Sequence, residues 1–425
     1  MLLSTSVETQ SSPAGPARSD HFFITALGIG QICSWGSLYY SFPQLAEAMG
    51  GDLGWSKPEL YGAATLGLAL SGFAAYPVGA AIDRGHGRAV MGGASVLAGA
   101  LMLAWSQINA LPLFYVVFAG IGCLQAATLY EPAFAVVARR FGAAEARRGI
   151  TAVTLWGGFA STVFIPIVEL LIDQIGWRGA LATLGLTNIL LCAGLYFAAI
   201  RPELDAAPTI LRRPGTTRSA EREAVSRAAR SMVFWALALS FTAYAAIYSA
   251  FTLHLYPLLR ERGLDAAATV AVLACIGPAQ VAGRVLVWMF ASRTSVRRLG
   301  SMIVAIFPIA FIGIALLPPT LLAMAAVAAI YGGANGIMTI VRGMAVPDML
   351  SRESYGAING ALISPSLAAR AAAPIGAAAL WSATGNYDAV VLAMVVAAAI
   401  VAAGFWAAAL GAASHRRGGS IEVDR

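Results

Sequence analysis

The chain consists mainly of apolar runs, each about as long as one crossing of a lipid bilayer. A transmembrane helix needs about 20 predominantly apolar residues, and twelve runs come near that length. They are Phe22–Met49, Pro58–Ile82, Ala89–Trp105, Leu111–Val137, Ile150–Ile172, Gly179–Ile200, Met232–Leu258, Ala266–Phe290, Leu299–Leu317, Leu321–Val346, Tyr355–Trp381 and Ala389–Leu410. We therefore predict an all-α polytopic membrane protein with twelve transmembrane helices in a lipid bilayer.

The composition excludes most other classes of protein. Of the 425 residues, 12% are charged and 59% are apolar, whereas soluble domains carry about 25% charged residues. A soluble enzyme, a nucleic-acid-binding protein and a disordered chain are therefore excluded. The sequence has no phosphate-binding loop and only one lysine, Lys57, which excludes ATP-driven transport. The four cysteines show no disulfide or metal-ligand spacing, and we expect no cofactor.

One long polar segment divides the chain six runs to six. Residues 201–230 contain seven arginines, four acids and three prolines, a composition typical of a linker. We therefore predict a disordered tail at 1–20, a six-helix bundle at 21–200, a linker at 201–230, a second six-helix bundle at 231–412 and a tail at 413–425.

The basic residues predict the orientation in the membrane. If both termini and the linker share one side, that side holds 21 of the 28 basic residues, and the opposite side holds four, Lys57, Arg178, Arg260 and Arg262. Because short basic loops stay in the cytoplasm, both termini are expected to be cytoplasmic. Arginine in place of lysine, with many alanines, is typical of a GC-rich bacterial genome, so we expect a bacterial inner-membrane protein.

The two halves repeat one another. Three pairs of segments align at offsets of 208–212 residues: Ser37–Gly51 with Ser249–Gly263, Phe159–Ile167 with Leu367–Ile375, and Ile175–Leu181 with Thr384–Val390. Each pair falls at corresponding positions of the two sets of six runs. Two parallel repeats joined by a linker are typical of secondary transporters, so we predict two pseudo-symmetric six-helix bundles.

The loop after the second run carries a motif rich in glycine and charge. It reads Gly79-Ala-Ala-Ile-Asp-Arg-Gly-His-Gly-Arg88. This motif resembles the signature of the major facilitator superfamily, with His86 where that family usually has glycine. The resemblance implies a secondary carrier whose two halves rock, and Gly79 is expected to let its helix approach a neighbour closely.

The charged residues of this motif are expected to gate the rocking. Asp83 would face a helix N-terminus, or pair with Arg139 or Arg140, in a clamp that breaks when the halves move. Arg84 and Arg88 complete the charged set. The alternative is ordinary cytoplasmic charge around a short turn.

Within the superfamily, the chain is most similar to the branch of monocarboxylate porters and oxalate–formate exchangers. The similar segments are Ser34–Ser41, Gly176–Arg178 and Gly385–Asp388. That branch carries an arginine in helix 8, and the oxalate–formate type adds a cation in helix 11. Arg284 and Arg370 occupy the matching positions, and the resemblance implies that they bind the substrate.

Three arginines fall inside predicted helices, where a charge is costly and therefore indicates function. We expect Arg284 and Arg370 to contact the substrate, and the alternative is a structural pair between helices. Arg342 is either the counterpart of Glu131 in the other half, at the binding site, or a marker of the cytoplasmic end of its helix. Gln280 stands where monocarboxylate porters place an acid, which puts their proton-linked arginine–acid pair in doubt.

Two further titratable residues have open roles. Glu131 is the one acid deep in the first half. It is a proton site, a partner for an arginine across the cavity, or a clamp with Arg139 and Arg140. His254, near the end of the seventh run, is expected to be a solvated histidine, with pH sensing as the alternative.

Polar-tipped side chains line up at helical spacing in two runs. Gln31, Trp35 and Tyr39 are four residues apart and so share a helix face, as do Tyr244 and Tyr248. The two interpretations are aromatic packing and substrate contact. Because helices 1 and 7 line the cavity in the fold that the chain resembles, we place Gln31, Trp35, Tyr39 and Tyr248 at the binding site.

The sequence therefore predicts a secondary active transporter that moves a small organic anion, a carboxylate, by alternating access. Three deep arginines against one deep acid make the cavity positive and favour an anionic substrate, with a proton as candidate coupling ion. The alternatives are an exporter of amphiphilic or metabolite-type solutes, and a carrier-like sensor that binds without translocating.

Overall fold

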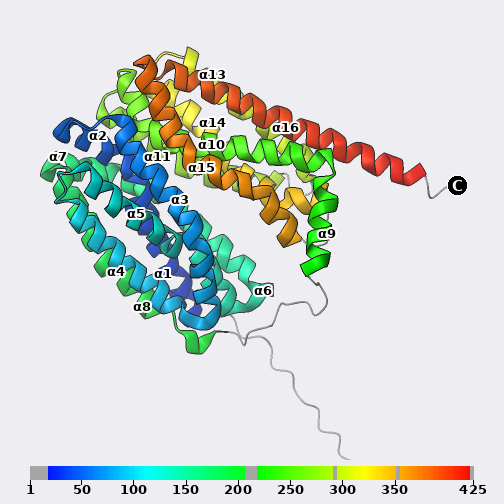
Figure 1. Cartoon of the computed structure of the whole chain (residues 1–425), viewed down its shortest axis with the longest axis horizontal. Helices are drawn as coiled ribbons and strands as arrows, with labels where there is room; N and C mark the ends of the chain where they lie inside the picture. Colours follow the sequence, from blue (N-terminus) through cyan, green and yellow to red (C-terminus); the bar gives the residue numbers. More distant parts are fainter. Residues whose placement is uncertain (1–17, 206–217, 291–293, 351–354, 422–425) are drawn as a thin grey trace, which may run out of the picture.

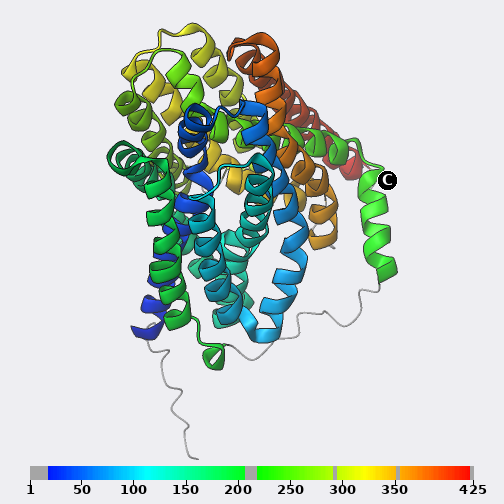
Figure 2. The same cartoon turned by 60° about the vertical axis from the view of Figure 1, so that its left-hand side comes forward.

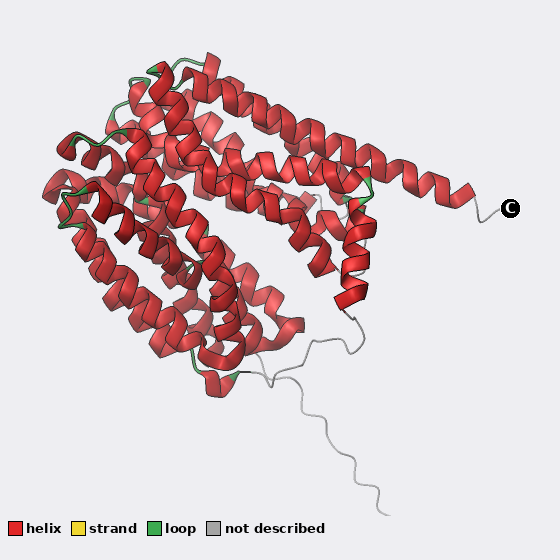
Figure 3. Cartoon of the chain, viewed as in Figure 1, coloured by secondary structure: helices red, strands yellow, loops and turns green. Residues whose placement is uncertain are grey.

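A computed structural model describes residues 18–205, 218–290, 294–350 and 355–421, and most of them are helical (Figure 1). The helices are α1 (Arg18–Trp35), α2 (Phe42–Leu53), α3 (Lys57–Ala81), α4 (Gly87–Trp105), α5 (Leu111–Thr128), α6 (Tyr130–Gly157), α7 (Ala160–Leu186), α8 (Ala193–Ala199), α9 (Arg218–Ala229), α10 (Met232–Glu261), α11 (Ala266–Phe290), α12 (Val296–Val304), α13 (Ile306–Leu316), α14 (Leu321–Met349), α15 (Tyr355–Thr384) and α16 (Asp388–Ile421). No strand occurs in the described ranges (Figure 3).

The prediction of twelve crossings is confirmed. Nine helical stretches of the described chain are long and apolar enough to span a membrane. Two of them, Lys57–Trp105 and Arg148–Leu204, each hold two predicted crossings, which are joined at Gly85 and Gly176 with φ angles of 93° and 70°. Glycine adopts such positive φ angles without strain. With α15 as a further crossing, the nine stretches account for all twelve.

The helices form two bundles with separate hydrophobic cores. One core extends from Phe23 to Ile200 and takes in only Leu253 and Ala378 from the second half, and the other runs from Ala224 to Ala412 with Ile165 as its one first-half member. The bundles meet at one end and diverge towards the end where α9 lies (Figures 1 and 2). We call the α9 end the terminal face and the opposite end the far face. The molecule is closed at the far face.

The halves share the same turn chemistry at the far face. Gly54 and Gly263, with φ of 70° and 95°, follow the ends of α2 and α10. Ser56 and Asp265 then cap the next helices, through a capping box and through a bond of 2.7 Å from Ala268 N to the carboxylate. The separations 263 − 54 and 265 − 56 are both 209. Because the first aligned segment pair was offset by 212, its register is corrected by three residues.

An acid at the same repeat position ties each half together. Asp52 and Glu261 are also 209 residues apart. Asp52 accepts a hydrogen bond of 3.0 Å from Trp177 Nε1, while Glu261 accepts bonds of 2.6 Å from Trp381 Nε1 and 2.7 Å from Tyr387 N. In each half, the acid joins the end of the first helix to the region between the fifth and sixth.

A proline in α10 creates a contact between the halves. Proline has no N–H, so the carbonyl four residues earlier in a helix loses its usual donor. Pro257 leaves Leu253 O free in this way, and Tyr61 Oη of α3 donates to it at 2.9 Å. The second half thus offers a main-chain acceptor to a hydroxyl of the first.

The same arrangement recurs between α7 and α11. Pro278 leaves Ala274 O without its helical donor, and Thr162 Oγ1 donates to this oxygen at 2.9 Å. The helices approach closely here, because a Cβ at Gly277 would lie only 2.6 Å from Gly158 O. Both hydrogen bonds have their donor in the first half and their acceptor in the second.

Candidate functional site

His254 lies at the far face, between the two halves. Its side chain is completely buried and stacks on Tyr61 of the first half, with ring centroids 4.0 Å apart and an interplanar angle of 17°. Nδ1 is 2.9 Å from Tyr387 Oη and Nε2 is 2.9 Å from Pro374 O. The expectation of a solvated histidine is therefore wrong, because its neighbours come from helices distant in sequence.

Lys57 adds a charged contact beside this stack. Its Nζ lies 4.0 Å from the ring centroid of Trp381 and 4.9 Å from that of Tyr387. A cation over an aromatic face is attracted by the negative face of the ring. We call Lys57, Tyr61, His254, Trp381 and Tyr387 the far-face latch, because they join the first half to the second.

The three arginines predicted inside helices all belong to the second half and cluster around Tyr244. They are Arg284 of α11, Arg342 of α14 and Arg370 of α15. The guanidinium of Arg342 lies 5.4 Å from the Tyr244 ring, and the charges of the other two arginines also act on that tyrosine. Arg370 lies 6.0 Å from the ring of Tyr39 in the first half. The cluster therefore faces the first half.

Each of these arginines keeps a buried nitrogen without a partner among the described residues. These are Arg284 Nη1, Arg342 Nε and Arg370 Nε. Arg284 Nε donates to Gly336 O at 3.3 Å, so a main-chain carbonyl uses part of that guanidinium. Buried donors are normally paired, so unpaired donors on three neighbouring cations are available to an acceptor-rich ligand.

The first half presents aromatic rings to the arginines. Residues 36–40 form a π-helical turn, a feature frequent at functional sites. Trp35 contacts Tyr39, Tyr40 and Tyr130, with centroid distances of 5.4, 6.1 and 5.0 Å. Trp35 Nε1 is buried and has no partner within the described chain, whereas Tyr39 Oη lies beside Arg370 and Ser249. Tyr130, the first residue of α6, belongs to this aromatic group but is not among the site residues predicted from the sequence.

We call Trp35, Tyr39, Tyr40 and Tyr130 the aromatic wall, and Gln31 is not part of it. Its Nε2 donates to Thr128 O at 2.8 Å and to Tyr196 Oη at 3.3 Å, inside the first half. Thr128 is the last residue of α5, and the carbonyls of the last turn of a helix have no donor within the helix. The Gln31 amide supplies the missing hydrogen bond, which gives it a structural role in this conformation.

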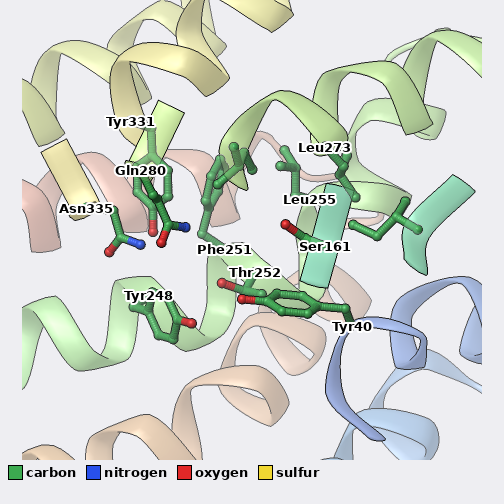
Figure 4. Close-up of a pocket in the computed structure, with 12 residues that line it drawn as sticks. Tyr40, Ser161, Tyr248, Phe251, Thr252, Leu255, Leu273, Gln280, Tyr331 and Asn335 are labelled. Carbon is green, nitrogen blue, oxygen red and sulfur yellow. The ribbon is translucent and has the colours of Figure 1, made fainter. Parts of the chain in front are cut away.

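Tyr248 lines a small cavity between the halves (Figure 4). The cavity measures about 30 Å³, enough for water but too small for an organic substrate. Its other polar lining residues are Tyr40, Ser161, Thr252, Gln280, Tyr331 and Asn335. Tyr244 Oη donates to Asn335 Oδ1, which connects this neutral cavity to the arginine cluster.

Glycines hold the arginine-bearing helices α11 and α14 together. A Cβ at Gly283 would lie 2.5 Å from Gly333 O, one at Gly332 would lie 2.8 Å from Ile276 O, and one at Gly336 would clash with Gln280 O. Small residues allow such close backbone contact between membrane helices. We call Gly283, Gly332 and Gly336 the glycine seam, and it fixes Arg284 relative to Arg342.

Glu131 faces the arginine cluster from the first half. Its side chain is exposed, and its charge acts on Arg370 and on Tyr130. Glu131 of the first half is therefore near enough to Arg370 of the second for their charges to interact.

Arg139 and Arg140 are engaged elsewhere. Arg139 Nε pairs with Asp205 at 3.0 Å, and Arg140 pairs with Asp20 at 3.0 Å. The expected clamp between Asp83 and Arg139 takes another form, because Arg139 donates to the Asp83 carbonyl oxygen while the Asp83 side chain is exposed. The ion pair that holds this loop is formed by the linker residue Asp205, which the sequence analysis did not select.

The glycines of the motif behave differently from one another. Gly85 adopts φ of 93° and makes the turn. A Cβ at Gly79 would meet no atom within 4 Å, so the predicted close approach of its helix is absent from this conformation of the described chain. Arg84 and Arg88 are exposed on the terminal face.

The fold and its enclosed polar centre define a polytopic membrane transport protein. The sequence matches the profile of the Major Facilitator Superfamily over residues 27–374. The chain therefore belongs to this superfamily, and it is a transporter rather than an enzyme.

Sequence relatives and solved structures agree with this assignment. The chain is 31% identical to human monocarboxylate transporter 11 over 284 residues, which cover 63% of this chain and 56% of that protein. It is 26% identical to monocarboxylate transporter 13 of Bos taurus over 391 residues, 87% of this chain and 83% of that one.

The structure resembles those of other transporters in fold. A bacterial homologue of the human lysosomal transporter Spinster, in an inward-facing and occupied conformation, matches with a TM-score of 0.71 and 14% identity, covering 93% of this chain and 97% of that one. The nucleoside transporter NupG matches with a TM-score of 0.73 and 13% identity, covering 92% and 99%. At such identities the likeness concerns the fold alone.

Proposed function

We propose that this protein is a secondary active transporter that moves a small organic anion, a carboxylate, by alternating access. The observation that carries the proposal is the set of buried, unpaired donors that face one another from the two halves. In the described chain these are Arg284 Nη1, Arg342 Nε and Arg370 Nε of the second half and Trp35 Nε1 of the first.

Arginine and indole nitrogens can only donate hydrogen bonds, whereas a tyrosine hydroxyl can also accept. A carboxylate accepts several hydrogen bonds, and those from charged donors are shorter and stronger than neutral ones. The planar guanidinium also matches a carboxylate in geometry. The names of the sequence relatives, monocarboxylate transporters, agree with a substrate of this class.

The distribution of basic residues supports a cytoplasmic terminal face. That side carries 21 of the 28 basic residues, and positive loops remain inside. With this orientation the structure is inward-facing, since the far face is closed. The arginine- and alanine-rich composition supports a bacterial inner membrane.

Glu131 is our candidate for coupling. Because Arg139 and Arg140 are paired with Asp205 and Asp20, the local clamp is the least supported of its three roles. Proton binding and pairing with Arg370 remain, and they are compatible. A proton on Glu131 would release Arg370 for the substrate anion.

The test uses purified protein in detergent and in proteoliposomes. A thermal-shift screen against small carboxylates should show saturable stabilisation, since a ligand of the folded state raises apparent stability. Arg284→Ala and Arg370→Ala should each weaken binding about 10- to 100-fold, and Arg284→Lys should also weaken it despite retaining the charge. Arg298→Ala, at an exposed arginine, is the matched control.

The outcomes separate the alternatives. Uptake of the stabilising carboxylate supports transport, whereas binding without uptake identifies a sensor. If neither alanine variant changes binding, the arginine cluster is structural and the anion site is wrong.

A further inference from the structure

His254 is a buried titratable residue that the proposed anion site does not use. Its Nε2 must carry a proton, because the Pro374 carbonyl at 2.9 Å can only accept. In the neutral ring, Nδ1 then accepts from Tyr387 Oη, also at 2.9 Å. The closed far face therefore provides one donor and one acceptor partner, which is the requirement of a neutral imidazole.

Protonation would disturb this arrangement at Nδ1. The new N–H would point at Tyr387 Oη, whose own hydrogen would have to turn away into buried surroundings, since Tyr387 is only 1% exposed. The imidazolium would also be completely desolvated in the closed state, because His254 has an exposed fraction of 0%. Burying a charge without a counterion is costly.

The charged groups around the latch do not supply that counterion. Lys57 of α3 lies over the Tyr387 ring and adds a like charge. Glu261 is engaged by Trp381 Nε1 and Tyr387 N, and Glu47 is exposed. The stacked face of Tyr61 is the remaining attraction, and a cation–π contact offsets only part of the desolvation cost.

A proton can reach the latch from the far side. A cavity of about 510 Å³ at the far face is lined by Glu47, Lys57 and Glu261. Opening of the latch would separate Tyr61 from His254 and expose the imidazole to this space.

We infer that closure of the far face requires a neutral His254, so that acid on that side holds the far face open. The proton is not cargo, because it must leave the imidazole before the latch can close. A hydrated imidazole titrates near pH 6.5, so the closed-to-open ratio should fall by up to about tenfold for each pH unit below that value. The inference depends on alternating access and not on the substrate, so it can fail while the anion site stands.

The test measures the separation of two spin labels on the far face of the full-length protein in nanodiscs. The labels are placed at the exposed positions Ala110 and Pro319, in a chain whose four cysteines are replaced by alanine. From about pH 8 to about pH 5, on either side of the hydrated imidazole value, the population of long distances should rise.

His254→Gln is the decisive variant. Its amide can donate to Pro374 O and accept from Tyr387 Oη, but it cannot be protonated in this range, so its distances should not change with pH. Tyr387→Phe removes the hydrogen bond that Nδ1 accepts in the closed state, which lowers the closed-to-open ratio at every pH, so the midpoint of the opening transition should move to higher pH. His86→Gln, at an exposed histidine on the terminal face, is the control, and its label distances should change with pH as those of the parent chain do.

Three results would overturn the inference: a parent chain whose distances do not respond to pH, a His254→Gln variant that follows the parent, or an unchanged transition in Tyr387→Phe. If His254 has a purely structural role, the label distances of His254→Gln should differ from those of the parent by the same amount at every pH. The pH at which opening is half complete should then be unchanged in Tyr387→Phe.

Discussion

The two halves share the same internal hydrogen bonds at Asp52 and Glu261, which we call the shared joints, but they present different groups to each other. Asp52 and Glu261 occupy one repeat position and make equivalent ties. Towards the centre, however, the second half supplies three arginines and two proline-released carbonyls, whereas the first supplies hydroxyls and aromatic rings. The repeat therefore preserves the hydrogen bonds within each half, whereas the groups at the interface between the halves differ.

The halves contact each other through hydrogen-bond donors in the first half and acceptors in the second. Tyr61 and Thr162 are donors of the first half, and Leu253 O and Ala274 O are acceptors of the second. Each acceptor exists because a proline removed its helical partner. Such neutral contacts can form and break during rocking without stranding a charge in the membrane.

The largest effect is expected from the arginine cluster, which lies in the second half only. Arg342→Gln should weaken carboxylate binding by about 10- to 100-fold, because it removes a charged donor from the cluster around Tyr244. Titration calorimetry measures the change. Unaltered affinity would place Arg342 outside the site and leave the second half with two functional cations.

The shared joints should show a smaller effect, in stability rather than binding. Glu261→Gln should lower the free energy of unfolding by about 2 kcal/mol, since it weakens two short charge-assisted hydrogen bonds. Asp52→Asn should cost about 1 kcal/mol, because that carboxylate accepts one hydrogen bond, of 3.0 Å from Trp177 Nε1, where Glu261 accepts two. Denaturant titration in detergent compares the pair. A larger loss of unfolding free energy in Asp52→Asn than in Glu261→Gln would contradict this prediction.

The proline-released acceptors are tested by restoring the missing donor. In Pro278→Ala the new N–H competes with Thr162 for Ala274 O, so the closed far face should lose about 1 kcal/mol, or about fivefold in population. Thr162→Val should act similarly, and Pro77→Ala, at an exposed proline of α3, should not. The label distances at the far face report the result, and identical distances in all three variants would refute the mechanism.

The smallest effect is expected at the terminal face of the first half. Asp205→Asn breaks the ion pair with Arg139 and should slow transport about threefold, within the range of a partly exposed pair. Asp83→Asn should slow it less, because the Asp83 contact to Arg139 uses the carbonyl. Neither should change substrate affinity, and initial uptake rates with a binding assay test both. An equal loss of affinity would show that this face communicates with the cluster.

The fold was predictable because its signals are local. Each crossing must be apolar over its own length, and the turn glycines stand in the sequence beside the motifs that they shape, as Gly85 does. The register of the repeat was less certain, and only the paired caps at Gly54 and Gly263 set it at 209.

The site was predictable only in part, because partners depend on packing between distant segments. The deep arginines were visible as charges inside apolar runs. The role of Gln31 was not, since its partner Thr128 O becomes free only because α5 ends there, and the sequence does not show which donor reaches it. The burial of His254 likewise depends on Tyr61 and Tyr387, which lie 193 and 133 residues away.

The glycine seam has a mechanical consequence for the transport cycle. Because the α11 and α14 backbones are in close contact at Gly283, Gly332 and Gly336, the two helices have little room to slide past one another, and we expect them to move as one rigid unit. The separation of Arg284 and Arg342 then stays constant throughout the cycle, while the distance from either to Tyr39 of the first half changes. If the proposed anion binds to that pair, we expect it to move with the second half and to be released when Trp35 and Tyr39 of the first half move away.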